Sequence, residues 1–139
     1  MLDIDHFKAI NDRHGHAVGD QVLTAVAERL HRGVRGPDTV ARFGGVEFGV
    51  LLPEAGADEA CIVTERLLAT IRTLEVPGAP GLAVRASAGV AAPLAGAPCP
   101  EDAEALMTAA DRALYEAKRS GRDRYCVEVV EAVPTPAPR

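Results

Sequence analysis

Two consecutive glycines, Gly44 and Gly45, stand between two short runs that favour β-structure, Thr39 to Phe43 and Glu47 to Leu52. Paired glycines flanked by such runs indicate a β-hairpin, because a tight turn needs positive φ angles that other residues rarely adopt. The missing Cβ atoms also let a ligand oxygen approach the backbone N–H groups of the turn. The residues alone leave two interpretations open: a plain turn, or a cradle for phosphate.

Hydrophobic periodicity predicts the elements on either side of this hairpin. Val18, Val22, Val26 and Leu30 recur at helical spacing, and Gly36-Pro37 ends the helix that they define. The expected elements are a strand at 2–5, helices at 6–13 and 18–34, strands at 39–43 and 47–52, a helix at 60–74, a half-buried strand at 83–90, a helix at 102–120 and a strand at 125–130. This order predicts the α/β class, as an α+β sandwich with a ferredoxin-like, mixed, largely antiparallel sheet flanked by helices.

The length of 139 residues suffices for one compact domain, which we expect over residues 1–130. The 15 basic and 20 acidic residues give a formal net charge of −5, which argues against nonspecific binding to nucleic acid or to an anionic membrane. No apolar run reaches transmembrane length. The cysteines Cys61, Cys99 and Cys126 are widely spaced, so we expect three reduced thiols in a cytoplasmic protein.

Both ends of the chain carry an expectation of their own. Charged and patterned sequence begins at the third residue without a signal peptide, so we expect a natural N-terminal segment to be missing before Met1. Residues 131–139 contain three prolines, and we expect them to form a disordered tail.

Two carboxylates, Asp3 and Asp5, stand at the end of the first expected strand. Strand alternation sends both to one face with Ile4 buried behind them, and a carboxylate beside a glycine hairpin suits a hard cation such as Mg²⁺. The alternative is that Asp5 caps the helix that follows, and for Asp5 we favour this alternative.

Polar residues of the first two helices form a second group. Lys8 and Asn11 are three residues apart on one face of the short helix, and Asp20 lies near the start of the next one. An Asn and an Asp together can bind the donor and acceptor edge of a guanine. A solvated helix face is the alternative, and the spacing does not exclude it.

Two further pairs of charged residues stand near the ends of helices. Lys118 and Arg122 are four residues apart at the end of the last long helix, where cations are favoured by the helix dipole whatever the function, although they would also fit as phosphate ligands. Arg35 and Asp38 flank a turn, where a surface ion pair worth about 0–1 kcal/mol is the simplest interpretation.

In their order and spacing these signals closely resemble the GGDEF family of diguanylate cyclases. The matching strings are Leu2-Asp3-Ile4-Asp5-His6-Phe7-Lys8, Ile10-Asn11-Asp12, Gly15-His16, Gly19-Asp20, Arg42-Phe43-Gly44-Gly45, Ala110-Asp111, Ala113-Leu114-Tyr115, Ala117-Lys118 and Gly121-Arg122. The resemblance extends from Met1 to about Val127 and implies a fold of the nucleotidyl-cyclase and polymerase-palm kind.

The resemblance implies an activity: the condensation of two GTP molecules into cyclic di-GMP and two diphosphates by a homodimer of bacterial domains. It implies a fused or paired sensory or regulatory domain, and Mg²⁺ or Mn²⁺ held by Asp3 and the backbone carbonyl of Ile4. The implied substrate-binding residues are Lys8, Asn11, Asp20, Gly44, Gly45 and Arg122, and Lys118 is an implied catalytic residue that binds or neutralises the triphosphate. Arg35, Asp38 and Arg66 fall where the family's inhibitory R-x-x-D site binds cyclic di-GMP.

The sequence departs from the family pattern at two places. Val46 stands where the family has a metal-binding Asp or Glu, also considered as the base for the 3′-hydroxyl. We expect a loss of two or more decades in rate, since each 1.36 kcal/mol of transition-state stabilisation is worth about tenfold. Glu47 remains as a catalytic candidate, but strand alternation is expected to turn it to the opposite face. The family's N-terminal helix and Asp-x-Leu-Thr-x-Leu-x-Asn-Arg string are also lacking.

Three functional hypotheses follow. The domain is a cyclase that is impaired or inactive because of Val46; it is a cyclic di-GMP receptor that uses Arg35 and Asp38; or it is a GTP-binding module that regulates a fused partner.

Overall fold

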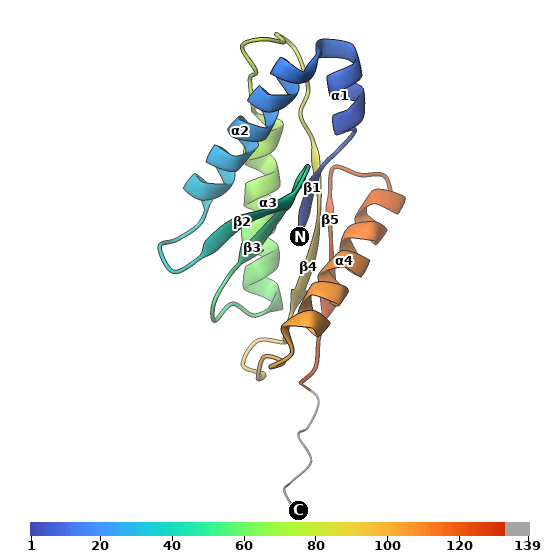
Figure 1. The fold of residues 1–139 in the computed structure, drawn as a ribbon. Helices are drawn as coiled ribbons and strands as arrows, with labels where there is room; N and C mark the ends of the chain where they lie inside the picture. The colour runs from blue at the N-terminus through green and yellow to red at the C-terminus, as the bar shows by residue number, and fades with distance from the viewer. Residues whose placement is uncertain (133–139) are drawn as a thin grey trace, which may run out of the picture.

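The computed structural model describes residues 1–132, and within them the chain folds into four helices and a five-stranded sheet (Figure 1). The elements are β1 (Leu2–Ile4), α1 (Phe7–His14), α2 (His16–Gly33), β2 (Thr39–Gly44), β3 (Glu47–Leu51), α3 (Ala57–Arg72), β4 (Ala86–Ala92), α4 (Ala103–Arg119) and β5 (Tyr125–Val129). The predicted order of strands and helices is confirmed. The predicted disordered tail falls largely on residues 133–139, outside the described residues.

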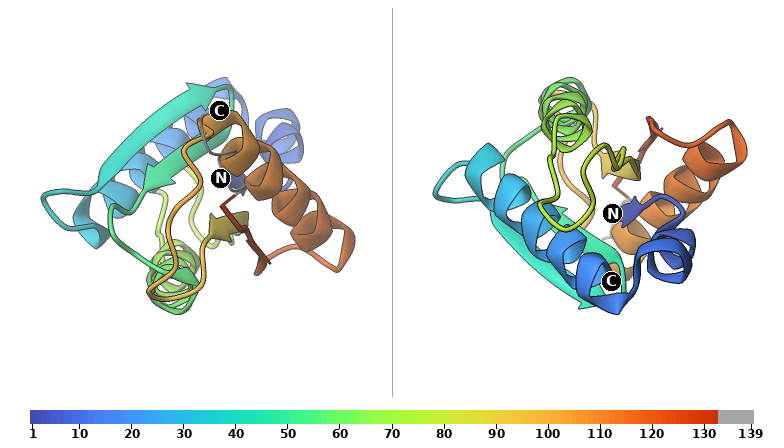
Figure 2. Two further views of the ribbon diagram at one scale, coloured as in Figure 1. Left: turned by 90° about the horizontal axis from the view of Figure 1, so that it is seen from below. Right: turned by 90° about the horizontal axis from the view of Figure 1, so that it is seen from above.

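The sheet is mixed, with the strand order β2-β3-β1-β4-β5. The pairs β2–β3, β3–β1 and β1–β4 are antiparallel, and only β4 and β5 run parallel. Figure 2 shows α4 on one side of the sheet and α3 on the other, with α2 lying along β2 and β3 on the side of α3. This arrangement confirms the predicted α+β sandwich with a largely antiparallel sheet.

The larger hydrophobic core lies on the face that α2 and α3 cover. Val22, Val26 and Leu30 of α2 are fully buried and belong to one cluster with Leu2 and Ile4 of β1. The other buried members of this cluster come mainly from α3 and from the sheet, among them Phe48, Leu67, Leu68, Ile71, Ala86 and Ala88. The helical spacing in the sequence therefore correctly identified the face of α2 that is buried.

The opposite face of the sheet is covered by α4 through small residues. Ala109, Ala110, Ala113 and Ala117 are buried, and a Cβ atom added to Gly89 of β4 would lie 2.1 Å from the carbonyl oxygen of Ala110. The α4 backbone thus packs directly on β4, which Gly89 makes possible.

This packing corrects the prediction for β4. The strand runs over Ala86–Ala92 rather than 83–90, and both of its faces are buried, with Ser87 fully inaccessible. The alternation of apolar residues with Ser87 and Gly89 looked like a half-exposed strand. Small residues on the second face instead allow a helix to approach closely, as in strands that are covered on both sides.

Helix length and composition also bear on membranes. Between Met1 and Ala132, none of the helices is both long and apolar enough to cross a bilayer.

Candidate functional site

The carboxylates of Asp3 and Glu47 meet at the end of β1. Asp3 pairs directly with Glu47 on β3 and with Ser87 on β4, and residues opposite each other in an antiparallel pair project to the same face. Asp3 and Glu47 therefore share the face of the sheet that α4 covers farther along. Glu47 thus lies on the face opposite Val46, as strand alternation predicts, but the register against β1 shows that this face is also the face of the metal candidate Asp3.

Val46 projects to the other side of the hairpin. Its side chain is half-buried and packs against the core cluster of Leu2, Ile4 and Phe48. Its backbone carbonyl accepts the N–H of Ile4 at 3.4 Å, so Val46 also closes the ladder between β1 and the hairpin. The valine is therefore a packing residue in this structure.

Lys118 of α4 lies against Asp3. The Lys118 Nζ atom is 2.5 Å from Asp3 Oδ2, and the two side chains are 35% and 16% exposed. This ion pair brings together two residues that are 115 positions apart in the sequence. The predicted metal ligand and the predicted phosphate-binding lysine are thus in direct contact.

These residues are compatible with a divalent cation that completes its coordination with other ligands. Within residues 1–132 no group of three or more His, Cys, Asp and Glu side chains is placed to hold a metal. Mg²⁺, however, keeps several waters and is commonly bound by one or two carboxylates together with substrate phosphates. Asp3 and Glu47, with the carbonyl of Ile4 beside them, fit that pattern.

The glycine turn is open to solvent. Gly44 and Gly45 have φ angles of 145° and 33°, and a Cβ atom added to either would meet nothing within 4 Å. Arg42 closes the turn by donating from Nε and Nη2 to the carbonyl oxygen of Gly45, at 3.0 and 2.6 Å. The register of the β2–β3 ladder shifts between Arg42 and Gly44. The hairpin is confirmed; its role as a phosphate cradle remains a prediction.

The junction of α1 and α2 holds an unusual amide. The Oδ1 atom of Asn11 is buried and has no hydrogen-bond partner in the described part of the chain. Gly19 makes room for it, because a Cβ atom at that position would lie 1.8 Å from the Asn11 oxygen. Lys8 and Asp20, the other predicted members of this group, are exposed on the same two helices. A buried oxygen without a donor costs free energy and calls for a ligand or water.

The predicted Arg35–Asp38 pair forms a tight turn after α2. The Asp38 carboxylate accepts the N–H of Arg35 at 2.8 Å, and the Arg35 guanidinium lies 3.5 Å from Glu59 on α3. The Asp38 side chain is 2% exposed, and its Oδ1 atom is the second buried acceptor without a partner among residues 1–132. Arg66 donates to the carbonyl of Gly33 at 2.7 Å, which brings it beside the same turn.

Asp5 differs from its predicted role. The N-cap position of α1 is His6, in a left-handed conformation, and no side chain caps this helix. The Asp5 carboxylate is buried and accepts hydrogen bonds from the Ser87 hydroxyl at 2.7 Å and from the Asp123 N–H at 2.9 Å. Sequence reasoning missed Ser87 and Asp123, since nothing in the local sequence links them to Asp5. The helix-cap interpretation was wrong.

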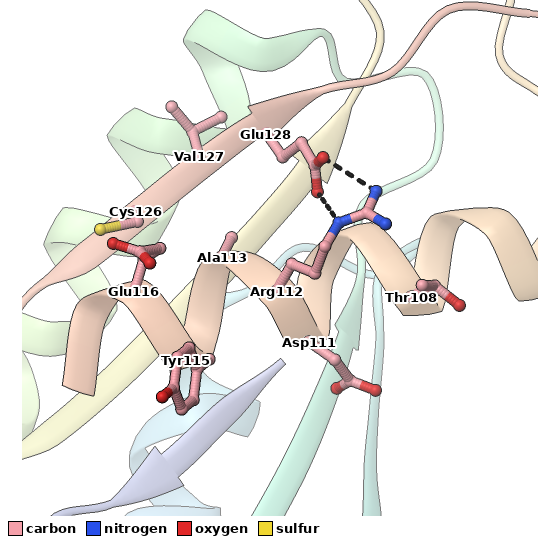
Figure 3. Close-up of a pocket in the computed structure, with 9 residues that line it drawn as sticks. All are labelled: Thr108, Asp111, Arg112, Ala113, Tyr115, Glu116, Cys126, Val127 and Glu128. Atoms are coloured by element: carbon pink, nitrogen blue, oxygen red, sulfur yellow. Dashed lines mark hydrogen bonds and ion pairs between the residues drawn. The ribbon is translucent and has the colours of Figure 1, made fainter. Parts of the chain in front are cut away.

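A groove lies elsewhere, away from the predicted site residues. It has a volume of about 680 Å³ and runs between α4 and β5, where the Arg112 guanidinium binds both oxygens of Glu128 (Figure 3). None of the predicted site residues lines it. A second groove of about 500 Å³ lies between α2 and the segment that follows α3, and Asp20 is part of its wall.

The mixed sheet and its helices form an α+β palm-like fold, with paired carboxylates at one strand end and a glycine hairpin beside them. The chain belongs to the GGDEF family of diguanylate cyclase domains. The sequence profile described as "Diguanylate cyclase, GGDEF domain" matches residues 1–124.

Individual relatives agree with this assignment. The chain is 46% identical over 126 residues to diguanylate cyclase DgcP of Pseudomonas aeruginosa, covering 89% of this chain and 18% of the relative. It is 41% identical over 124 residues to the probable diguanylate cyclase DgcC of Escherichia coli K12, covering 89% and 33%. The chain thus spans only a fifth to a third of the length of these curated relatives.

Solved structures show the same fold. The diguanylate cyclase SiaD of Pseudomonas aeruginosa, in complex with its activator SiaC, superposes with a TM-score of 0.81 at 40% identity, covering 93% of this chain and 48% of SiaD. The GGDEF domain of DgcB from Caulobacter crescentus, in complex with c-di-GMP, gives 0.79 at 35% identity, covering 91% and 74%.

Proposed function

We propose that this domain binds GTP at the α1–α2 junction and the glycine hairpin, and that Val46 strongly impairs its diguanylate cyclase activity. The observation that carries the proposal is the buried, unpartnered Oδ1 atom of Asn11, for which Gly19 leaves room. Family membership supports the choice of a guanine nucleotide as the missing partner.

The chemistry of this junction favours guanine over adenine. The Watson–Crick edge of guanine presents two donors, the N1–H and the 2-amino group, whereas N1 of adenine is an acceptor. The Asn11 amide oxygen and the Asp20 carboxylate are both acceptors. A buried acceptor left without a donor penalises the wrong base, so selectivity should be strong.

The phosphates would lie over the open hairpin. Gly44 and Gly45 are exposed there with open space at their Cα atoms, and Lys118 lies at the adjoining strand end beside Asp3. Lys8 and Arg122 are exposed and add positive charge. Mg²⁺ or Mn²⁺ would be held by Asp3, the carbonyl of Ile4 and Glu47, and it would neutralise charge on the phosphate oxygens.

Cyclisation needs two such domains. The 3′-oxygen of one GTP must attack the α-phosphate of the other and expel diphosphate, so two GTP-loaded copies must face each other. A carboxylate at position 46 would accept the proton of that hydroxyl or bind metal, and a valine can do neither. If Val46 abolishes turnover completely, the domain is a GTP-binding regulatory module.

Calorimetric titration with GTP and with ATP in the presence of Mg²⁺ tests the binding proposal. We expect GTP to bind and ATP to bind at least tenfold more weakly. Asn11→Ala should abolish the preference, whereas Asp12→Ala, an exposed neighbour on the same helix, should retain it. Absence of heat with GTP at millimolar concentration would overturn the proposal.

A second function is favoured by the other unpartnered buried acceptor, Asp38 Oδ1. The Arg35–Asp38 turn would bind cyclic di-GMP, with Asp38 accepting from guanine and Arg35 leaving Glu59 to bind the ligand. Titration with cyclic di-GMP should give binding that Arg35→Ala or Asp38→Ala abolishes. Arg32→Ala, an exposed arginine one turn earlier, is the matched control. No binding by the unaltered chain would exclude a receptor role.

A further inference from the structure

The turn after α4 has a strained backbone. Gly121, Arg122 and Asp123 have consecutive positive φ angles of 129°, 63° and 49°. Gly121 is explained by the helix end, because the Arg122 N–H binds the carbonyl of Ala117 and the Gly121 N–H binds that of Lys118, as in a Schellman motif. That motif does not require a left-handed conformation at the next two residues, which costs free energy for side chains other than glycine.

The Asp5 carboxylate is hydrogen-bonded to the backbone of this turn. Its Oδ2 atom accepts the Asp123 N–H at 2.9 Å, and its Oδ1 atom accepts the Ser87 hydroxyl at 2.7 Å. Asp5 is 7% exposed and Ser87 is fully buried. Both carboxylate oxygens are therefore committed to protein donors, which leaves Asp5 poorly placed to be a metal ligand.

Two arginines, Arg72 and Arg85, also interact with Asp123. Arg72 donates to Asp123 Oδ1 at 2.9 Å and to its backbone carbonyl at 3.2 Å, and Arg85 lies 3.6 Å from Asp123 Oδ2. The hydrogen bond to Asp123, with a second one to Glu65, raises the pKa of Arg72 above its ordinary value. Asp123 thus has three partners, Asp5, Arg72 and Arg85, while the neighbouring Arg122 is exposed.

We propose that Asp5 is a positioning residue that fixes the left-handed turn and thereby holds the Arg122 guanidinium ready for the phosphates of the nucleotide. Asp5 is two residues beyond Asp3, so one short segment carries the metal candidate and the anchor of the Arg122 turn. The inference rests on the proposed function, because it takes the GTP phosphates as the ligand of Arg122.

The first test measures hydrogen exchange in the turn in the absence of any ligand. Hydrogen exchange should show the Asp123 amide protected in the unaltered chain. In Asp5→Ala this protection should fall at least tenfold, while the amides of β3 and β4 stay protected. Asp5→Asn retains an amide oxygen that can accept the Asp123 N–H, and should keep most of the protection. It also provides a folded variant if Asp5→Ala does not fold. Unchanged exchange at Asp123 in a folded Asp5→Ala protein would overturn the inference.

The second test separates positioning from general stability. We expect Asp5→Ala and Arg122→Ala each to weaken GTP binding about tenfold and to leave guanosine binding unchanged. The double variant should bind GTP no more weakly than either single variant, because both remove the same contact. Additive losses would indicate that Asp5 acts through Asp3 instead and would overturn the inference. GTP binding that is weakened by Arg122→Ala but not by Asp5→Ala would also overturn the inference. Absence of GTP binding by the unaltered chain would overturn the proposed function itself.

Discussion

Asp3 and Glu47 lie directly opposite each other on the antiparallel strands β1 and β3, and their carboxylates share one face of the sheet. Lys118, on α4, forms an ion pair with Asp3 and neutralises part of its negative charge. Two carboxylates held side by side repel each other unless a cation lies near both. This relationship makes Glu47, rather than position 46, the carboxylate that the present fold places beside Asp3.

Glu47→Gln should therefore remove most of the effect of Mg²⁺ on nucleotide binding. A neutral amide is a much poorer ligand for Mg²⁺ than a carboxylate. We expect GTP affinity in Mg²⁺ to fall about tenfold, which is about 1.4 kcal/mol, while affinity in EDTA stays unchanged. Calorimetry under the two conditions measures this. Glu101→Gln, an exposed residue before α4, should behave like the unaltered chain. An unchanged Mg²⁺ effect in Glu47→Gln would contradict the assignment.

Val46→Asp should raise cyclase activity and lower stability together, because the Asp side chain must leave the core-facing side of the hairpin to reach the metal candidates Asp3 and Glu47. A gain of two decades corresponds to about 2.7 kcal/mol of transition-state stabilisation at 1.36 kcal/mol per decade. Because Val46 is half-buried against the core, a charge there should lower the free energy of unfolding by about 1–3 kcal/mol. Product formation from GTP and urea unfolding measure the two effects. Leu51→Asp, which adds a carboxylate at an exposed position of β3, the strand that follows Val46, should not raise activity.

Local sequence determines much of this fold. The nine elements could be predicted because helical spacing, strand alternation and glycine or proline breaks act over a few residues. The Gly44-Gly45 hairpin and the polar groups at Asn11 and Asp38 were likewise visible as motifs.

The errors, and the relationship that the sequence did not reveal, all concern long-range pairing. That Glu47 lies beside Asp3 depends on the register between β3 and β1, which the hairpin residues do not encode by themselves. Asp5 looked like a helix cap because its partner Asp123 is 118 positions away. The second buried face of β4 depends on α4, whose backbone approaches Gly89 only in the folded chain.

The reactivity of Cys61 should depend on pH differently from that of an ordinary exposed thiol. Burial raises the pKa of the Cys61 thiol, and the nearby Asp58 adds to this, although a hydrogen bond with Tyr125 acts in the opposite direction. Because the thiolate is the nucleophile, a raised pKa lowers its fraction at neutral pH. We expect iodoacetamide to modify exposed Cys99 first at pH 7, with Cys61 reacting only as the pH rises. Peptide mass spectrometry measures the order, and urea should abolish the difference. Equal rates in the folded protein at pH 7 would contradict this prediction.

Gly89→Ala should force α4 away from the sheet. The added Cβ atom would lie 2.1 Å from the carbonyl oxygen of Ala110 and 2.2 Å from the backbone nitrogen of Leu114, so α4 would have to move away from β4. Overpacking of this kind costs about 1–3 kcal/mol, and rigid backbone on the α4 side places the loss at the upper end. Gly36→Ala is the matched control, since a Cβ atom there meets nothing within 4 Å. Its effect should stay within about 0.5 kcal/mol. Urea unfolding measures the stability of both variants.

A shift of α4 also moves Lys118 away from Asp3, so Gly89→Ala should weaken GTP binding, whereas Gly36→Ala should not. Full stability of Gly89→Ala would show that α4 can slide along β4 without loss.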